Sequence, residues 1–483
     1  MLFNSLDFAI FLPIVFILYW FVFNKKIKAQ NLLILLASYV FYGWWDWRFL
    51  SLILFSTILD YSICRKLKTE ESRASRKSLL WLSIIVNLGF LGFFKYYNFF
   101  LDNFIAAFSF FGKPINPSSL NIILPVGISF YTFQTLSYTI DVYKRNLKPT
   151  TDFIAFGAFV SFFPQLVAGP IERASNLLPQ FYSKRKFDYT KSVDGLRQIL
   201  WGLFKKVVIA DNCAQYANLF FNNSDEYSGS TLFLGAIFFT FQIYGDFSGY
   251  SDIAIGTSRL FGFNLMKNFS FPYFSRDMAE FWRRWHISLS TWFRDYLYIP
   301  LGGSRGGTWM KVRNTFIIFL VSGFWHGANW TFIIWGGLNA LFFMPLLLLK
   351  KNRNNLEVIA EDSFFPSLTE FIKMVITFLL TVFAWIFFRS ESVEHAFSII
   401  FKILSPSFFE IPHFFGMGKA VTTIVLILIF MFVEWFGRRD EYGLEKIGFT
   451  WNKSIRLGFY MFIIFLIGMF MQTDESPFIY FQF

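Results

Sequence analysis

Cysteine and histidine are both scarce in this sequence. Of its 483 residues, two are cysteines and four are histidines. Cys64 and Cys213 each stand alone without a C-x-x-C motif, and no group of histidines and cysteines has the spacing of a zinc site. The sequence therefore predicts two buried structural thiols and no bound metal.

Signals for a soluble or secreted protein are absent as well. The chain shows no internal repeat, no soluble domain and no low-complexity linker. Its N-terminus lacks a basic region and a small-residue cleavage site, so the apolar stretch from Phe8 to Phe23 is predicted to be a retained helix and not a removed signal. The alternating segments of about ten residues that build membrane β-barrels are also missing.

Apolar residues dominate what is present. They make up 55% of the chain, aromatic residues make up 23%, and 72 residues are Phe. A soluble domain of this size could not bury so much apolar surface without large exposed patches. The apolar residues gather in runs of about 20, the length that spans a bilayer as a helix. The predicted fold class is all-α, a polytopic membrane helical bundle in which residues 1–483 form a single integral-membrane domain.

The net charge of +12 follows the same pattern. The basic residues lie between apolar runs, where Lys and Arg mark cytoplasmic loops. Membrane topology explains this distribution, so we expect membrane lipids as partners and no nucleic acid. Loops at residues 25–28 and 65–77 are predicted to be cytoplasmic. The resulting topology has 11 or 12 spans, with the N- and C-termini both extracytoplasmic.

Three stretches depart from simple spans. Residues 153–171 lie between basic flanks and include Pro164, Gly169 and Pro170, which predicts a re-entrant or broken helix. Residues 264–314 are basic, with aromatic residues at helical spacing, and predict amphipathic helices at the cytoplasmic face. Residues 316–349 are long enough for two short passes, with a bend expected at Gly336-Gly337.

Two histidines occupy unusual positions. His326 lies about ten residues into an apolar run, about 15 Å along a helix, and an ionisable group at that depth is a functional-site hypothesis by default. Burial favours the neutral imidazole, which suits a general base for a hydroxyl. A structural histidine that bonds two helices is the alternative. His286 follows two arginines and is expected at the cytoplasmic side or at shallow depth.

Other polar residues near these histidines have several interpretations. Arg283 and Arg284 could meet phosphate or anionic headgroups, or extend to the membrane interface as solvated side chains. Asp246 and Asp252 could cap a helix, pair with nearby arginines or orient a histidine. The glycine-rich turn at residues 300–307 lacks the Lys-Ser/Thr of a P-loop and is expected to be a plain cytoplasmic loop.

Several motifs, in order along most of the chain, carry a resemblance to a known family. Two contain the histidines: Arg284-Trp285-His286, and Trp325-His326 with Gly327, Ala328, Asn329 and Trp330. Further matching stretches are residues 163–171, 246–252, 296–305 and 478–483. Together they resemble the membrane-bound O-acyltransferase family, and most of all its bacterial alginate O-acetyltransferase-like branch.

The resemblance implies a membrane enzyme that moves an acyl group from a cytoplasmic thioester to a hydroxyl, in a helical bundle around a transmembrane funnel or tunnel. It implies His326 as the main catalytic residue and His286 as the second catalytic position. Residues expected to bind the donor are Arg283, Arg284, Trp285, Arg294 and Arg305. Supporting residues are expected to be Asp246, Asp252, Trp325, Asn329 and Trp330.

The function implied is transfer of an acetyl group toward an exported or cell-surface polysaccharide, as in alginate biosynthesis. It would take place in the bacterial cytoplasmic (inner) membrane, with a separate extracytoplasmic transferase as partner. The expected donor is acetyl-coenzyme A, with an acyl or aminoacyl carrier protein as the alternative, and no cofactor is expected to be permanently bound. D-alanyl transfer to teichoic acid and peptidoglycan O-acetylation are the alternative reactions.

Two noncatalytic functions provide further alternatives. A transporter or export channel would carry intramembrane acids and inverted repeats, and the sequence shows neither. A noncatalytic scaffold predicts that both histidines can be replaced without loss of product.

Overall fold

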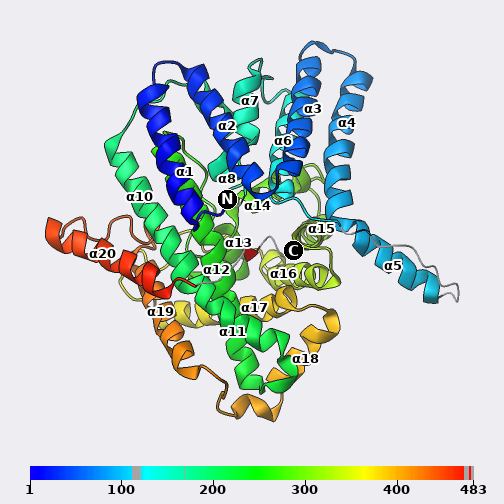
Figure 1. Cartoon of the computed structure of the whole chain (residues 1–483). Coiled ribbons are helices and arrows are strands. Elements are labelled where there is room, and N and C mark those ends of the chain that lie inside the picture. Colours follow the sequence, from blue (N-terminus) through cyan, green and yellow to red (C-terminus); the bar gives the residue numbers. More distant parts are fainter. Residues whose placement is uncertain (111–119, 121, 168, 473–477, 480–483) are drawn as a thin grey trace. The chain divides into compact units, whose positions relative to one another are not determined.

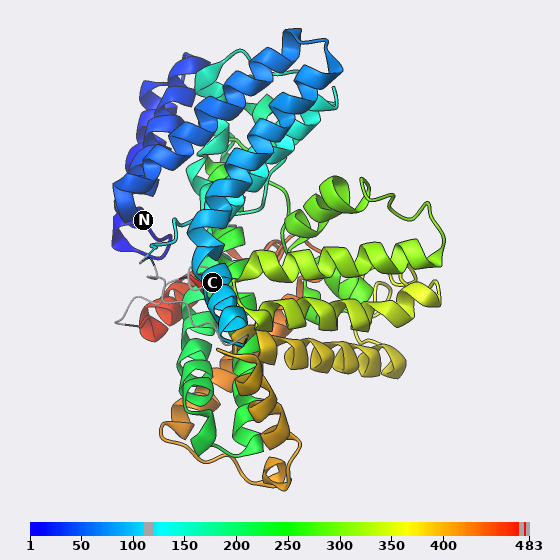
Figure 2. The same ribbon diagram turned by 90° about the vertical axis from the view of Figure 1, so that its right-hand side faces the viewer.

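The structure is a computed structural model that describes residues 1–110, 120, 122–167, 169–472 and 478–479. Within these residues every regular element is a helix, which confirms the all-α prediction (Figures 1 and 2). Six helical segments are long and apolar enough to cross a membrane. They are Ile27–Thr69, Arg73–Ser109, Trp330–Leu348, Leu368–Arg389, Met417–Phe436 and Lys453–Phe470. The chain is thus a polytopic helical membrane protein, while the count of 11 or 12 spans and the orientation of the termini stay predictions.

The described chain divides into two compact units. Unit 1 comprises residues 1–192 and 257–266, and unit 2 comprises residues 193–256 and 267–483. The division reflects contacts within each unit and does not decide how many functional domains the chain has, so a single functional domain remains a prediction.

Unit 1 contains the N-terminal helices (Figure 1). Its longer helices α3, α4 and α6 pack against one another, and α2 packs against α7. The bounds are α1 Leu6–Ile17, η1 Leu18–Val22, α2 Ile27–Asp46, α3 Leu50–Thr69, α4 Arg73–Leu91, α5 Tyr97–Phe110, α6 Ile128–Tyr143, α7 Phe153–Val160, α8 Phe163–Leu166 and α9 Ala174–Leu177.

The helix expected over residues 153–171 is broken. Its first part, α7, ends at Val160, and α8 begins at Phe163. Pro164 lies in the first turn of α8, where its missing N–H costs nothing. The Phe163 N–H donates to Ser38 Oγ at 3.0 Å, so a neighbouring helix satisfies a backbone group that the break frees. The predicted break in the helix is confirmed. Re-entry of this segment into a membrane is still a prediction. Ala168 lies outside the described residues.

Unit 1 also buries a carboxylate, Asp60 of α3, in a helix long enough to span a membrane. Three neutral groups donate to it: Ser83 Oγ at 2.5 Å, Asn87 Nδ2 at 3.0 Å and Thr139 Oγ1 at 3.2 Å. In unit 2, Glu434 is buried in Met417–Phe436. The prediction that intramembrane acids are absent was therefore wrong, because a lone acid hardly lowers the average hydropathy of its run.

Unit 2 is built around the long helix α12, and α15, α16 and α17 pack side by side in sequence order (Figure 2). The bounds are α10 Tyr189–Leu203, η5 Phe204–Ala210, α11 Asp211–Asn222, α12 Gly229–Leu260, α13 Met278–Arg284, α14 Ile287–Phe293, η8 Arg294–Tyr298, α15 Thr308–His326, α16 Trp330–Leu348, α17 Leu368–Arg389, α18 Val393–Ile403, α19 Met417–Phe436 and α20 Lys453–Phe470.

Two helices, α15 and α16, cover the stretch 316–349, but the bend is not at Gly336-Gly337. Of the two, α16 is a candidate membrane span, and two passes stay a prediction. The chain turns between His326 and Trp330, where Asn329 Oδ1 accepts the Thr331 N–H at 3.0 Å and caps α16. Gly336 instead lies where α16 crosses α15, because a Cβ added there would come within 2.3 Å of the Phe319 carbonyl oxygen. The glycine permits close helix packing and does not break the helix.

Candidate active site

His326 is the last residue of α15 and is enclosed by aromatic rings. Its ring centroid lies 4.8 Å from that of Trp325, 5.1 Å from that of Trp335 and 5.5 Å from that of Phe388. The Trp335 ring is perpendicular to the imidazole. Only 3% of His326 is exposed. Its position at the end of α15, against α16 and α17, explains why three helices contribute to this aromatic cage.

His286 lies at the junction of two short helices, α13 and α14. Its backbone has φ of +44°, a left-handed conformation that costs a non-glycine residue about 1–2 kcal/mol. Neighbouring hydrogen bonds hold the turn: the Ile287 N–H donates to the Asn268 carbonyl at 2.9 Å, and the Ser290 N–H donates to the His286 carbonyl at 3.0 Å. A residue held in such a conformation by its surroundings is a candidate for function.

The two histidines are neighbours. Their ring centroids are 6.5 Å apart, and His286 is also buried, with its ring 4.6 Å from that of Phe247. The sequence predicted His286 at the cytoplasmic side or at shallow depth, and His326 deeper. Both depths stay predictions, but the two rings lie close together because α13 and α14, of seven residues each, meet at the buried His286.

Asn268 determines which nitrogen of His286 carries the proton. Its Oδ1 accepts from the Ser288 N–H at 3.4 Å and from Ser288 Oγ at 2.9 Å, so this atom is an acceptor. His286 Nδ1 lies 3.0 Å from the same oxygen and must therefore donate. Burial lowers the pKa of His286 to about 3, which keeps the ring neutral near pH 7. We infer that the lone pair of the neutral ring is on Nε2.

Two acids of α12 pair with buried lysines. Asp246 Oδ1 lies 2.7 Å from Lys206 Nζ, and Asp252 Oδ2 lies 2.5 Å from Lys205 Nζ. The partners are lysines of η5 and not arginines, and α12 continues to Leu260, so neither acid caps it. Burial alone would lower the pKa of Lys206, but Asp246 and the adjacent Asp211 more than offset this and hold it above its ordinary value.

Asp246 also binds the C-terminal region, because its Oδ2 accepts the Ile479 N–H at 2.6 Å. Phe478 then packs on Phe247 and Tyr250, with ring centroids 5.8 Å and 4.5 Å apart. Phe247 therefore contacts both the tail and His286. Residues 480–483 of the tail motif lie outside the described residues.

The sequence matches the membrane-bound O-acyltransferase family, MBOAT, over residues 79–425. The chain belongs to this family. It is accordingly an integral-membrane O-acyltransferase, and its two buried histidines lie in the family-like motifs of its second unit.

Similar proteins cover most of the chain. The "Probable alginate O-acetylase AlgI" of Pseudomonas aeruginosa is 40% identical over 450 residues, which are 92% of this chain and 82% of that protein. The protein of the same name in Pseudomonas putida is 38% identical, with both chains covered in full. The "Peptidoglycan O-acetyltransferase" of Helicobacter pylori is 37% identical over 83% of this chain and 79% of its own length.

The donor-binding arginines predicted for this O-acyltransferase are dispersed in the structure. Arg284 binds Glu280 Oε1 at 2.9 Å, and Arg283 donates to the carbonyls of Asn352 and Asn355. Arg294 is exposed beside Asp295. These partners are protein groups, so the contacts of Arg283 and Arg284 favour a structural role.

The remaining predicted residues differ in burial. Trp285 and Trp325 are buried, and Trp325 lies against both histidines, with its ring 6.1 Å from that of His286. Asn329 caps α16 and donates to the Glu391 carbonyl, whereas Trp330 is exposed. Arg305 is exposed in the turn before α15. Of this set, Trp325 is the residue that lines the space between the histidines.

Sequence reasoning missed the lysines and Asn268. Lys205 and Lys206 carried a usable signal, because two adjacent charges within the apolar run of residues 199–209 are costly unless they are paired. Asn268 carried no such signal. It is a single amide in a loop, and only the folded chain brings it to His286.

Proposed function

We propose that this enzyme moves an acetyl group from a cytoplasmic thioester across the membrane, toward hydroxyls of an exported or cell-surface polysaccharide. The observation that carries the proposal is the pair of buried imidazoles 6.5 Å apart within an aromatic cage. The names of the two alginate O-acetylase relatives, which match 92% and 100% of this chain, support acetyl as the group and a polysaccharide as the acceptor.

In the proposed reaction His326 accepts the proton of the attacking hydroxyl. A C–O bond forms to the thioester carbonyl carbon, the C–S bond breaks, and the proton passes from His326 to the leaving thiolate. His286 stays neutral and positions the donor: its Nε2 accepts a hydrogen bond from an amide N–H of the pantetheine arm, and its ring face packs beside the thioester. A placed base typically contributes about 10²–10⁴-fold to the rate, and orientation in a dry cage supplies much of the remainder.

The proposed setting follows from the basic loops. The donor is acetyl-coenzyme A, which reaches the enzyme from the cytoplasm, and the protein lies in the bacterial cytoplasmic membrane with both termini outside. The acetyl group leaves on the outer side, where a separate transferase places it on the polymer. A carrier-protein thioester is the alternative donor.

Sealed vesicles that contain the purified full chain test the proposal. Radiolabelled acetyl-coenzyme A is supplied on one side, soluble polysaccharide and the separate transferase are supplied on the other, and the labelled polymer is isolated. We expect label on the polymer for the wild type and for His413→Gln, an exposed histidine, and a large loss for His326→Gln. Equal labelling by both variants would remove His326 from the mechanism.

Peptidoglycan is the second candidate acceptor. The Helicobacter pylori relative favours it, since it is 37% identical over 83% of this chain. Supplying peptidoglycan fragments and alginate-type polysaccharide together, and separating the labelled products, distinguishes the two. Label that requires an aminoacyl carrier protein would instead indicate D-alanyl transfer to teichoic acid.

A further inference from the structure

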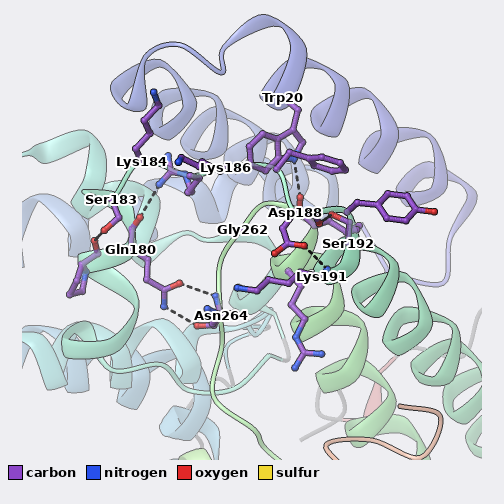
Figure 3. A pocket seen from close by; sticks show the side chains of 16 residues that line it. Trp20, Gln180, Ser183, Lys184, Lys186, Asp188, Lys191, Ser192, Gly262 and Asn264 are labelled. Atoms are coloured by element: carbon purple, nitrogen blue, oxygen red, sulfur yellow. Dashed lines mark hydrogen bonds between the residues drawn. The ribbon is translucent and has the colours of Figure 1, made fainter. Parts of the chain in front are cut away.

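Unit 1 contains a groove that the reaction described above does not use. Its volume is about 780 Å³. The chain from Gln180 to Ser192 forms one side, Trp20 of η1 closes one end, and residues 259–264 complete the floor (Figure 3). All of these residues belong to unit 1. We call this cavity the basic groove.

Positive charge dominates the basic groove. Five of its lining residues are cationic and one is acidic, a balance of 5 − 1 = +4. The acid, Asp188, is engaged by the helix that follows it, since its Oδ1 accepts the Lys191 N–H at 3.1 Å. The cationic residues are Lys184, Arg185, Lys186, Lys191 and Arg259. Such a concentration of one sign attracts anions.

The charge beneath the groove is not neutralised by an acid. Arg185 is buried and donates to the Gln180 carbonyl at 3.0 Å and to Asn31 Oδ1 at 2.7 Å, both neutral groups. Its guanidinium lies 4.8 Å from the centroid of the Phe263 ring, and its Nε has no acceptor among the described residues. Since the hydrogen-bond acceptors of Arg185 among the described residues are neutral, its positive charge still attracts anions.

Two lysines are available to a ligand. Among the described residues, the ammonium groups of Lys186 and Lys191 have no hydrogen-bond or ion-pair partner. Figure 3 shows Lys186 beside Trp20 and Lys191 reaching toward the middle of the groove, whereas Lys184 extends away from it. The geometry therefore offers two lysine ammonium groups beside one buried guanidinium, a set of donors suited to phosphate oxygens.

The end of the groove at Trp20 is aromatic. Trp20 Nε1 donates to the Leu260 carbonyl at 2.9 Å, which fixes the indole, and the Phe187 ring lies 5.6 Å away at 74°. A second cavity adjoins here and shares Trp20, Lys186 and Phe187 with the basic groove. Phe16 and Phe21 also line this second cavity, so the cations of the basic groove lie next to an apolar surface.

We propose that the basic groove binds the phosphate group of a ligand that also carries an apolar or aromatic part. Two sources share this chemistry: the nucleotide phosphates of a coenzyme thioester, and the headgroup of an anionic phospholipid. The coenzyme source rests on the proposed function, whereas the lipid source is independent of it.

The experiment compares two variants of the purified full chain in detergent. Lys186→Gln/Lys191→Gln removes both unpaired cations of the groove, and Lys66→Gln/Lys68→Gln removes the same charge from the exposed last turn of α3 in the same unit. One arm measures equilibrium binding of radiolabelled coenzyme A. The other measures retention of phosphatidylglycerol against phosphatidylcholine by native mass spectrometry. Thermal unfolding confirms that both variants fold.

We expect the groove variant to bind one of the two probes about 30-fold more weakly than the wild type, since each of the two cations contributes about 1 kcal/mol and about 1.4 kcal/mol corresponds to tenfold in affinity. The control variant should match the wild type. Loss in the coenzyme arm identifies a nucleotide phosphate, and loss in the phosphatidylglycerol arm identifies a headgroup. Unchanged binding in both arms, or equal loss in the control, overturns the proposal. No turnover is measured, so the result is separate from that of His326→Gln.

Discussion

Asp60 in unit 1 and the histidine pair in unit 2 are both buried ionisable sites, but their surroundings are opposite in kind. Asp60 receives hydrogen bonds from three neutral side chains on two neighbouring helices. The histidines lie among rings, with His326 enclosed by Trp325, Trp335 and Phe388. The comparison shows that burial does not by itself indicate chemistry. A carboxylate surrounded by donors joins helices, whereas an imidazole enclosed by apolar faces can meet a substrate.

The largest expected difference is in activity. His326→Gln should lower the rate of acetyl transfer by about 10²–10⁴-fold, because the placed base is lost, while the midpoint of thermal unfolding changes little. Steady-state rates and unfolding curves of the same preparation provide the measurement. If Asp60→Asn lowered the rate per folded molecule as much, the two sites could no longer be distinguished as catalytic and structural.

A second comparison concerns charges that stabilise unit 2. Lys206→Met leaves Asp246 and Asp211 buried without their shared cation, and removing one partner of a buried pair typically costs about 3–5 kcal/mol. Lys446→Met removes an exposed pair and should cost at most about 1 kcal/mol. Chemical denaturation monitored by tryptophan fluorescence checks both values. Equal unfolding midpoints would show that the buried pair adds no stability.

The pH dependence of stability should report on His286. Its folded pKa of about 3 lies below the unfolded value near 6.5, so the unfolded chain binds more protons between these limits. The contribution of His286 is fully present above pH 6.5 and is lost as the pH falls toward 3, by about 1.4 kcal/mol per pH unit. His286→Gln should flatten this part of the stability profile and His413→Gln should not. Parallel profiles for the two variants would contradict burial of a neutral His286.

Variants of Asp60 should show the opposite of His326→Gln, a loss of stability without a loss of activity per folded molecule. Asp60→Asn leaves one acceptor oxygen where the carboxylate has two, so at least one of the three donors, Asn87 Nδ2, Ser83 Oγ and Thr139 Oγ1, loses the bond it makes to Asp60. An unsatisfied buried group costs about 1–3 kcal/mol, and we expect a destabilisation of that size with an unchanged rate per folded molecule. Thr139→Val, which removes one weaker donor at 3.2 Å, should cost less. A larger loss for Thr139→Val than for Asp60→Asn would contradict this ranking.

The smallest effect should come from Asn268. Asn268→Ala removes the acceptor that holds the His286 Nδ1–H, and loss of one such hydrogen bond corresponds to about tenfold in rate. Asn268→Asp keeps an acceptor but adds charge, so the acid limb of the pH–rate profile should move to higher pH. A purely structural Asn268 predicts that both variants change stability and neither changes the shape of that profile.

The all-helical fold could be predicted because it follows from the apolar composition of the chain. Runs of about 20 apolar residues require helices that satisfy their own backbone in lipid, and the break before Pro164 followed from its missing N–H. The bend assigned to Gly336-Gly337 was wrong, because a glycine that ends a helix and one that lets two helices touch look alike in a sequence. The distinction depends on a neighbour 17 residues away, Phe319.

The site was predictable only in part. Ionisable side chains in apolar surroundings are expensive, which singled out His326, and two adjacent lysines could have been noticed for the same reason. The proximity of His286 could not have been predicted, since it depends on a left-handed turn between two short helices. Nor could the role of Asn268, because no local pattern relates a loop amide to a ring 18 residues later.

The helices α15 and α16 touch beside the aromatic cage because two residues at their contact are glycines, which have no Cβ atom. A methyl group on Gly323 would come within 2.2 Å of the Phe332 carbonyl oxygen, and one on Gly336 within 2.3 Å of the Phe319 carbonyl oxygen. Trp335, beside Gly336, packs against His326. The smallest possible enlargement at either glycine would therefore separate the helices and widen the space around the imidazole. The width of the cage thus depends on two glycines whose hydrogen side chains allow the helix backbones to touch.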